Sequence, residues 1–253
     1  MKVHHWPPLA AAAMIVLLAF LPGASLHLFA VPLNTKASPR TNKIVIMPLG
    51  DSITFGEGSS SGDGYRFVLW QLLTTAGIKA TFVGSERSGS TSFPQPENEG
   101  HPGWRIAQIS AHIVSWLRTY RPDYVLLQIG TNDIVYKDHL AQAPARLKAL
   151  IDKITATLPG VTVLVAEITP LAPPREALVV SFNSAIPGIV RAEVAAGKHV
   201  RYVDIHDSLS LNDLLADKIH PDDAGYTLMA NTWYQALYPL LKTDTSNGKL
   251  AQK

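Results

Sequence analysis

Cysteine is absent from the 253 residues, which excludes disulfide bonds, thiolate metal ligands and lipid anchors attached to cysteine. Charged residues are few, at 17%, and the formal net charge is only +2. The charges are scattered and form no basic stripe, so we expect no nucleic-acid partner. No group of His, Asp and Glu has the spacing of a zinc site, and the Gly- and Ser-rich residues 57–64 lack the lysine of a P-loop. We therefore expect neither a metal nor another cofactor.

The N-terminal residues differ in composition from the rest of the chain. Lys2 precedes an almost unbroken apolar run over residues 9–21, and small residues follow at 22–25. This order is typical of a secretory signal peptide, and the run is shorter than the roughly 20 residues that span a bilayer. We expect residues 1–30 to be a signal peptide, with an N-terminal anchor as the alternative, and residues 31–42 to be a linker. The protein would then be secreted, with no stable membrane association after cleavage.

Short apolar segments alternate with amphipathic segments over residues 43–241, where we expect one domain. The apolar segments predict strands at 44–49, 80–84, 124–129, 161–168 and 200–205. Apolar residues at helical spacing predict helices at 65–76, 106–119, 140–158, 176–196 and 223–241, and Pro187-Gly188 could kink the fourth. This alternation indicates an α/β fold, a three-layer α/β/α sandwich with a central parallel sheet of about five strands. We expect a functional loop at 85–103 and a disordered tail at 242–253.

The first apolar segment stops at Gly50, and Asp51 and Ser52 follow it. A buried strand that stops at a glycine carries the next side chains to the edge of the sheet, which makes Ser52 a candidate nucleophile. Gly-Asp-Ser is also ordinary turn chemistry, so these residues have a second interpretation. The segment at 124–129 ends in a similar turn that contains Asn132. Parallel sheets bind ligands beyond the carboxyl ends of their strands, where both turns fall.

A serine hydroxyl is a weak nucleophile, so it needs a base within hydrogen-bond reach and a third group that orients the base. Three histidines are candidates: His101 in the long loop, His206 two residues after Asp204, and His220 three residues after Asp217. A carboxylate three residues before a histidine can meet it across one turn. The helix predicted just after His220 would hold its imidazole rigidly. We therefore favour Asp217 and His220.

An acyl-transfer enzyme also needs hydrogen-bond donors for the oxyanion. Three donors lie in suitable places: the backbone N–H of Ser52, the backbone of Gly103 at the end of the long loop, and the side-chain amide of Asn132. Gly103 and Asn132 could also be ordinary turn residues.

These segments resemble the four sequence blocks of the SGNH hydrolases, also called the GDSL esterase and lipase superfamily. The blocks, in the family's order, are Gly50-Asp51-Ser52-Ile53, Gly103, Gly130-Thr131-Asn132-Asp133 and Asp217-Lys218-Ile219-His220. The resemblance implies a flavodoxin-like SGNH hydrolase fold and a serine esterase. It also implies that Ser52 is the nucleophile, Gly103 and Asn132 are oxyanion donors, His220 is the base and Asp217 is its orienting acid.

Further segments resemble the family-3 carbohydrate esterases, which include acetyl xylan esterases. These segments are residues 47–54, 64–66, 82–85 and 99–104. The implied substrate is a small acyl ester, an acetyl ester in particular, as a small ester or on an acetylated carbohydrate. The alternatives are a lipase, lysophospholipase or thioesterase acting on longer acyl chains, and an inactive carbohydrate-binding protein on the same fold.

Several residues near the expected site are candidates for substrate binding. Aromatic rings could form a sugar platform, arginines could orient a substrate, and two aspartates stand beside the serine and the asparagine. These candidates are Tyr65, Trp104, Arg66, Asp51 and Asp133. Each could equally be a packing or surface residue.

Overall fold

The computed structural model describes residues 43–246, so the expected signal peptide, the linker and residues 247–253 lie outside the described part of the chain. The strand β1 (Ile44–Gly50) belongs to a seven-stranded sheet. On one edge it pairs in parallel with β5 (Tyr124–Gln128), and β6 (Thr162–Ala166) and β7 (Val200–Val203) continue the sheet in parallel. The four strands therefore end at one edge of the sheet.

The other edge of β1 is shared between two strands. The strand β2 (Ala80–Phe82) pairs with the first residues of β1, and β4 (Glu97–Gly100) pairs with the last two, both in parallel. The short strand β3 (Glu86–Arg87) lies antiparallel to β4. The expectation that residues 85–103 are wholly loop was therefore wrong, and the sheet has seven strands rather than about five. The strand β4 was missed because its residues, Glu-Asn-Glu-Gly, rarely form strands.

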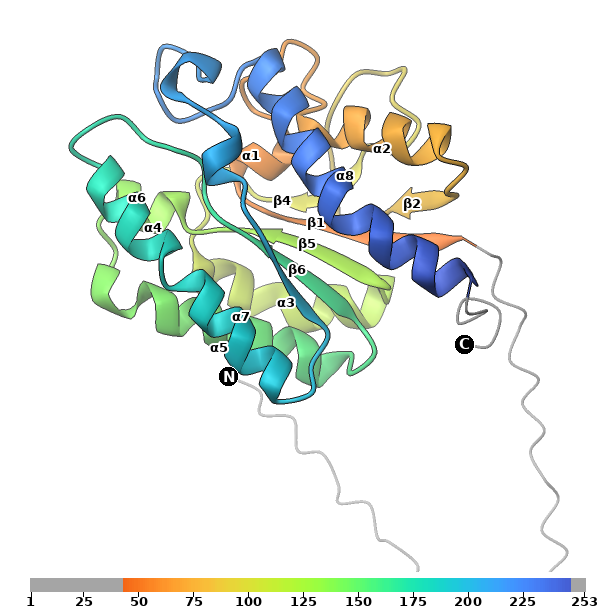
Figure 1. Ribbon diagram of the computed structural model, residues 1–253. Helices are drawn as coiled ribbons and strands as arrows, with labels where there is room; N and C mark the ends of the chain where they lie inside the picture. Colours follow the sequence, from red (N-terminus) through yellow and green to blue (C-terminus); the bar gives the residue numbers. More distant parts are fainter. Residues whose placement is uncertain (1–42, 247–253) are drawn as a thin grey trace, which may run out of the picture. The chain divides into compact units, whose positions relative to one another are not determined.

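Helices cover both faces of the sheet, as Figure 1 shows, and complete the expected three layers. The helices α2 (Tyr65–Thr75) and α8 (Asp223–Ser246) pack together on one face. On the opposite face lie α3 (Ile106–Tyr120), α5 (Ala143–Thr157) and α7 (Ile186–Ala195).

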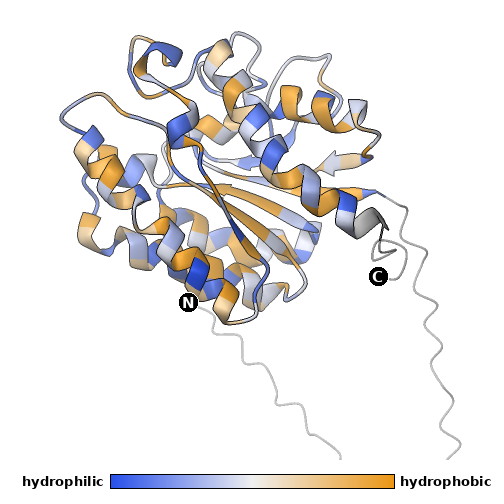
Figure 2. Ribbon diagram, viewed as in Figure 1, coloured by the Kyte–Doolittle hydropathy of each residue, from blue (hydrophilic) through white to orange (hydrophobic). Residues whose placement is uncertain are grey.

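The core consists of two apolar layers, because successive strand residues point to opposite faces. Met47 and Leu49 of β1 pack in the layer that contains α3 and α5, whereas Ile44 and Ile46 pack in the layer that contains α2 and α8. Figure 2 shows the central strands as mostly hydrophobic and the helices as two-sided. The continuous apolar character of these strands in the sequence follows from their burial on both faces.

Two helix predictions differ from the structure. The kink expected at Pro187-Gly188 is a complete break: residues 176–196 form two helices, α6 (Glu176–Asn183) and α7, and Pro187 occupies the first turn of α7. Proline favours a first turn because it has no N–H to donate there. The helix α8 continues to Ser246, past Pro239, so residues 242–246 are helical and not part of a tail.

Short helices follow two strands directly and were not predicted. The helix α1 (Ser52–Phe55) begins two residues after β1, and α4 (Thr131–Val135) begins three residues after β5. Residues 43–246 also contain three single-turn 3-10 helices: η1 (Leu140–Gln142), η2 (His206–Ser208) and η3 (Leu211–Asp213). The helices α1 and α4 place Ser52 and Asn132 at the carboxyl edge of the sheet.

Candidate active site

The turn between β1 and α1 fixes the position of Ser52. A Cβ atom on Gly50 would lie 2.2 Å from the carbonyl oxygen of Gln128 in β5, so only glycine fits there. Asp51 is the N-cap of α1, and its Oδ1 accepts a hydrogen bond of 3.0 Å from the N–H of Ile53. Ser52 is the first residue of α1 and is 6% exposed. Its hydroxyl therefore stands on a well-anchored turn.

A chain of hydrogen bonds joins Ser52, His220 and Asp217. The Oγ atom of Ser52 lies 2.9 Å from Nε2 of His220, and Nδ1 of His220 lies 2.7 Å from Oδ2 of Asp217. The imidazole therefore bridges a hydroxyl and a carboxylate that are far apart in the sequence. This is the arrangement of a nucleophile, a base and an orienting acid.

The segment between η3 and α8 holds Asp217 and His220 in place. The other carboxylate oxygen of Asp217, Oδ1, accepts hydrogen bonds from the N–H groups of Ile219, at 2.9 Å, and His220, at 3.1 Å. Partial burial raises the pKa of Asp217, but the hydrogen bonds from His220 and Ile219 outweigh it and bring the pKa below its ordinary value. Asp217 is therefore held as an anion that faces the imidazole.

Three donors for an oxyanion lie at the same edge of the sheet. The backbone N–H groups of Ser52 and Gly103 donate no hydrogen bond to any residue between 43 and 246. Gly103 has a φ of +76°, and a Cβ atom there would meet nothing within 4 Å, so the space on that side of its Cα is open. The side-chain amide of Asn132 donates one hydrogen bond of 3.1 Å to the carbonyl oxygen of Trp104 and has a second hydrogen left to donate. Asn132 thus also ties α4 to the loop that contains Gly103.

The carboxylate of Asp51 is buried beside this site. Asp51 is 1% exposed, and its Oδ2 has no hydrogen-bond partner within residues 43–246. Desolvation raises its pKa from 3.8 to about 6, although the hydrogen bond from Ile53 and the nearby imidazole of His220 oppose the rise. Asp51 does not face solvent, so its position does not support the expectation that it binds substrate.

Glu57 is a site residue that the sequence did not indicate. Its Oε2 lies 3.4 Å from Nε2 of His220, the same nitrogen that contacts Ser52. The residue belongs to the Gly- and Ser-rich segment 57–64, which we interpreted only as a loop. No sequence pattern relates it to His220, because 163 residues separate the two.

Two of the expected substrate-binding residues lie in the interior. The ring of Tyr65 is completely buried and packs against Trp233, with a centroid distance of 5.9 Å, so no sugar can stack on it. The guanidinium of Arg66 is also buried and donates to the carbonyl oxygens of residues 54, 55, 62, 88 and 96 and to the hydroxyl of Ser88. Burial lowers its pKa to about 10. Arg66 joins the segments around Ser52 and does not reach a substrate.

Asp133 is likewise a structural residue. It is completely buried, and its Oδ2 accepts a hydrogen bond of 3.0 Å from the N–H of Ile106 at the start of α3. Its Oδ1 accepts one of 2.7 Å from Arg146. Desolvation raises the pKa of Asp133, and the hydrogen bonds from Arg146 and Ile106 partly offset this rise. Both carboxylate oxygens are thus occupied by the protein, so Asp133 has none free for a substrate.

Trp104 lies next to Gly103 but is half-buried in an aromatic stack. The imidazole of His101 stacks on the rings of both Trp104 and Trp116, with centroid distances of 4.3 and 4.7 Å, and the two indole centroids are 6.1 Å apart. The Nε2 of His101 is 2.9 Å from a carboxylate oxygen of the buried Glu99. One face of the Trp104 ring is thus occupied by His101, and the stack supports the loop that presents Gly103. His101 is engaged in this stack and in the contact with Glu99.

The alternative pair, Asp204 and His206, does not form. His206 instead contacts Glu176 at 2.7 Å and Asp207 at 3.0 Å. Burial lowers the pKa of His206, but the hydrogen bonds that its ring donates to Asp207 and Glu176 outweigh this effect and raise the pKa above its ordinary value. The carboxylate of Asp204 accepts from the N–H of Asp207.

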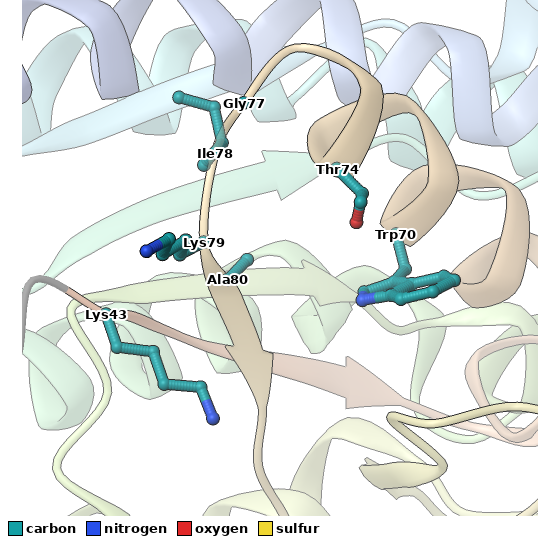
Figure 3. Close-up of a pocket in the computed structure, with 7 residues that line it drawn as sticks. All are labelled: Lys43, Trp70, Thr74, Gly77, Ile78, Lys79 and Ala80. Carbon is teal, nitrogen blue, oxygen red and sulfur yellow. The ribbon is translucent and has the colours of Figure 1, made fainter.

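Residues 43–246 contain no group of three or more His, Asp or Glu side chains placed to hold a metal ion. A cavity of about 580 Å³ opens elsewhere in the fold, as Figure 3 shows. Its lining consists of Lys43, Trp70, Thr74, Gly77, Ile78, Lys79 and Ala80. It lies by the amino ends of β1 and β2, at the opposite end of these strands from Ser52.

Comparisons with known proteins agree with this fold. The model of the GDSL-like Lipase/Acylhydrolase family matches residues 49–228, which include Ser52, Asn132 and His220. The solved structure of a Clostridium thermocellum family 3 carbohydrate esterase is 40% identical, with a TM-score of 0.73. The match covers 79% of this chain and 98% of that one.

Two curated relatives are longer than the matched region. A multidomain esterase of Ruminococcus flavefaciens is 30% identical over 242 residues, which are 85% of this chain but 31% of that protein. A protein of Acetivibrio thermocellus, named provisionally as endoglucanase X, is 38% identical over 139 residues, which are 54% of this chain and 59% of that protein. The chain thus spans less than two thirds of each of these relatives.

Proposed function

The chain belongs to the GDSL-like lipase/acylhydrolase family, and from that premise we propose that it is a serine esterase that removes small acyl groups, acetyl in particular, from carbohydrate. One observation carries the proposal. Ser52, His220 and Asp217 form a continuous chain of hydrogen bonds of 2.9 and 2.7 Å at the carboxyl edge of the sheet. Within this chain of contacts, Ser52 would be the nucleophile, His220 the base and Asp217 the acid that orients it.

In the first half of the reaction, Ser52 Oγ attacks the ester carbonyl while Nε2 of His220 accepts its proton. Asp217 holds the proton on Nδ1, which leaves Nε2 free to act as the base, and it stabilises the imidazolium that forms. Nε2 then gives its proton to the leaving alcohol, which leaves an acyl group on Ser52. In the second half, water repeats the attack with the same base and releases the carboxylic acid.

The negative charge that develops on the carbonyl oxygen requires donors already in position. The N–H groups of Ser52 and Gly103 and the remaining amide hydrogen of Asn132 are assigned this role. Loss of one such donor costs about 2.7–4 kcal/mol of transition-state stabilisation in a comparable enzyme. The assignment is supported by the absence of a described acceptor for either backbone group.

An acetylated carbohydrate is the substrate class best supported. The solved relative with 40% identity, which the chain covers almost completely, is named a family 3 carbohydrate esterase. The partial relative named provisionally as an endoglucanase makes glycoside cleavage a rival. That chemistry uses two carboxyl groups on either side of a sugar bond, whereas Asp217 is occupied with His220 and Asp51 is buried.

Secretion is part of the proposal and rests on the composition of residues 1–30. Mass spectrometry of the protein from the culture medium of an expressing host tests it. A mature protein that begins between about residues 22 and 31 is expected, and recovery only of the full chain with the cell membrane would contradict it.

The activity is tested by product release from 4-nitrophenyl acetate, 4-nitrophenyl octanoate, acetylated xylan and carboxymethylcellulose. We expect acetate release from the first and third and no sugar release from the last. Ser52→Ala is the control, and its loss of activity must be accompanied by an unchanged circular dichroism spectrum.

Each outcome has a distinct meaning. Preference for octanoate would replace the carbohydrate esterase with a lipase. Activity retained in Ser52→Ala would remove the assigned nucleophile. Absence of hydrolysis in the wild-type protein would favour a carbohydrate-binding protein on this fold.

A further inference from the structure

Glu57 lies outside the three residues assigned to catalysis, yet its carboxylate reaches the same imidazole. We propose that Glu57 is a specificity-determining residue, whose charge selects against esters with a negatively charged leaving group. The proposal rests on the proposed function, because it concerns which esters Ser52 accepts. It narrows the substrate class to esters of neutral, hydroxyl-bearing alcohols.

The Glu57 carboxylate lies beside the atom that protonates the leaving group. Its Oε2 lies 3.4 Å from Nε2 of His220, and Ser52 Oγ lies 2.9 Å from the same atom. Nε2 is the atom that must hand a proton to the leaving oxygen. The leaving group must therefore approach Nε2 closely, and Glu57 borders the space through which it leaves.

The backbone of Glu57 is fixed relative to the catalytic residues. Its N–H donates to the carbonyl oxygen of Ser52 at 3.0 Å, and its own carbonyl oxygen accepts from the hydroxyl of Tyr226. The next residue, Gly58, has a φ of +95°, and a Cβ atom there would lie 2.9 Å from Cβ of His220. The chain around Glu57 thus packs directly on the segment that carries His220, which limits where its carboxylate can lie.

Within residues 43–246, the Glu57 carboxylate makes no ion pair with a lysine or an arginine. Its side chain is 44% exposed, and its only ion-pair contact within residues 43–246 is with His220. The cations that neighbour the site in sequence are engaged elsewhere, since Lys218 donates to the carbonyl oxygen of Leu211 and Arg105 pairs with Asp138. The Glu57 carboxylate therefore stands at the site without an ion-pair partner among the lysines and arginines of residues 43–246.

Such a charge discriminates between leaving groups. A negative charge on the leaving group, held roughly 7–10 Å from the Glu57 carboxylate, would be repelled. This repulsion would lower kcat/KM roughly 3- to 30-fold, depending on how well water screens the two charges. A sugar hydroxyl, in contrast, can donate a hydrogen bond to the carboxylate. The site should therefore favour neutral sugar esters over esters of acidic sugars.

The test compares two esters that differ in one charge at one position. Methyl 4-acetoxybenzoate is neutral, and 4-acetoxybenzoate is an anion with the same acetyl group. The measured quantity is the ratio of kcat/KM for the anionic ester to that for the neutral ester, in the wild-type protein, Glu57→Gln and Glu57→Lys. Asp152→Asn is the matched control, since it removes one charge from α5, which lies away from α1 in Figure 1.

We expect the ratio to rise roughly 3- to 30-fold in Glu57→Gln and further in Glu57→Lys, and to stay at the wild-type value in Asp152→Asn. The rise should shrink when the ionic strength is increased from about 0.05 to about 0.5 M, because salt screens exposed charges. An unchanged ratio in an active Glu57→Gln protein would overturn this proposal alone. An equal loss of kcat/KM for both esters in Glu57→Gln would also overturn the proposal and would instead indicate that Glu57 stabilises the imidazolium of His220. If the wild-type protein hydrolyses neither of these esters nor 4-nitrophenyl acetate, the proposed function fails, and this inference fails with it.

Discussion

Replacement of Asp51 by asparagine should raise the free energy of unfolding above that of the wild-type protein by more at neutral pH than at acidic pH. The carboxylate of Asp51 is buried, and desolvation raises its pKa from 3.8 in the unfolded chain to about 6 in the folded protein. A raised pKa of an acid means that the folded state prefers the protonated form. Stability therefore falls as the pH rises through the interval between these two values and the carboxylate must ionise inside the protein.

The magnitude follows from the two pKa values. Each pKa unit is worth about 1.4 kcal/mol, so the ionised carboxylate costs the folded state about 3 kcal/mol at pH 7 and about 1 kcal/mol at pH 4.5. Asparagine does not ionise, but its side-chain oxygen can still accept from the N–H of Ile53 as the N-cap of α1. We subtract the free energy of unfolding of the wild-type protein from that of Asp51→Asn at each pH. This difference should be about 2 kcal/mol larger at pH 7 than at pH 4.5.

Guanidinium unfolding at the two pH values, followed by linear extrapolation, measures this difference. Titrating groups that do not interact with Asp51 contribute equally to both proteins and cancel, and any change that asparagine makes in packing is the same at both pH values. Because the imidazole of His220 interacts with Asp51, the comparison is repeated with His220→Ala present in both proteins. A difference between the proteins that does not vary with pH would refute the raised pKa. A difference that grows toward pH 4.5 would refute the sign of the argument, because it would mean that the Asp51 carboxylate is stabilised by its surroundings.

Three further predictions concern the residues around this turn. His220→Ala should lower kcat by at least about 10⁴-fold, whereas His206→Ala should retain most of it, and the reverse result would move the base to the other histidine. Asn132→Ala should lower kcat by about 10²–10³-fold with little change in KM, as expected for a donor that acts on the transition state, and a change in KM alone would contradict that role. Arg66→Met should destabilise the protein by roughly 3–5 kcal/mol in guanidinium unfolding, because several buried carbonyl groups lose their donor, and a loss below about 1 kcal/mol would show that those groups find other partners.

The sequence predicted the parallel sheet well because its strands are buried on both faces. Ile44, Ile46 and Met47 are all apolar, so β1 appears as a continuous apolar run that ends at a glycine. The same reasoning missed β4, whose Asn98 and Glu99 are buried but polar. Partners in the preceding segment, Ser85 for Glu99 and Ser88 for Asn98, satisfy these side chains at separations of 14 and 10 residues, which no helix or strand periodicity reveals.

The site was predictable to the extent that it lies in short segments. Asp217 and His220 meet across one turn, as their spacing suggested, and the contact of His220 with Ser52 is of the kind that the family resemblance implies. Burial could not be predicted from residue type alone. Tyr65 and Arg66 follow a flexible-looking glycine-rich segment, yet both lie in the interior because α2 packs against α8 and the ends of α1 and β4 converge on the guanidinium.

The buried guanidinium of Arg66 also determines how the protein should respond to proteases and to deuterated water. It holds the end of α1, the glycine-rich segment and the β3–β4 hairpin through separate carbonyl groups. If one of these segments unfolded alone, the buried Arg66 guanidinium would lose hydrogen-bond acceptors. The three segments should therefore unfold together and not one at a time. Amides in all three should then exchange hydrogen at similar rates, and the glycine-rich segment should resist cleavage although its composition suggests an easily cut loop.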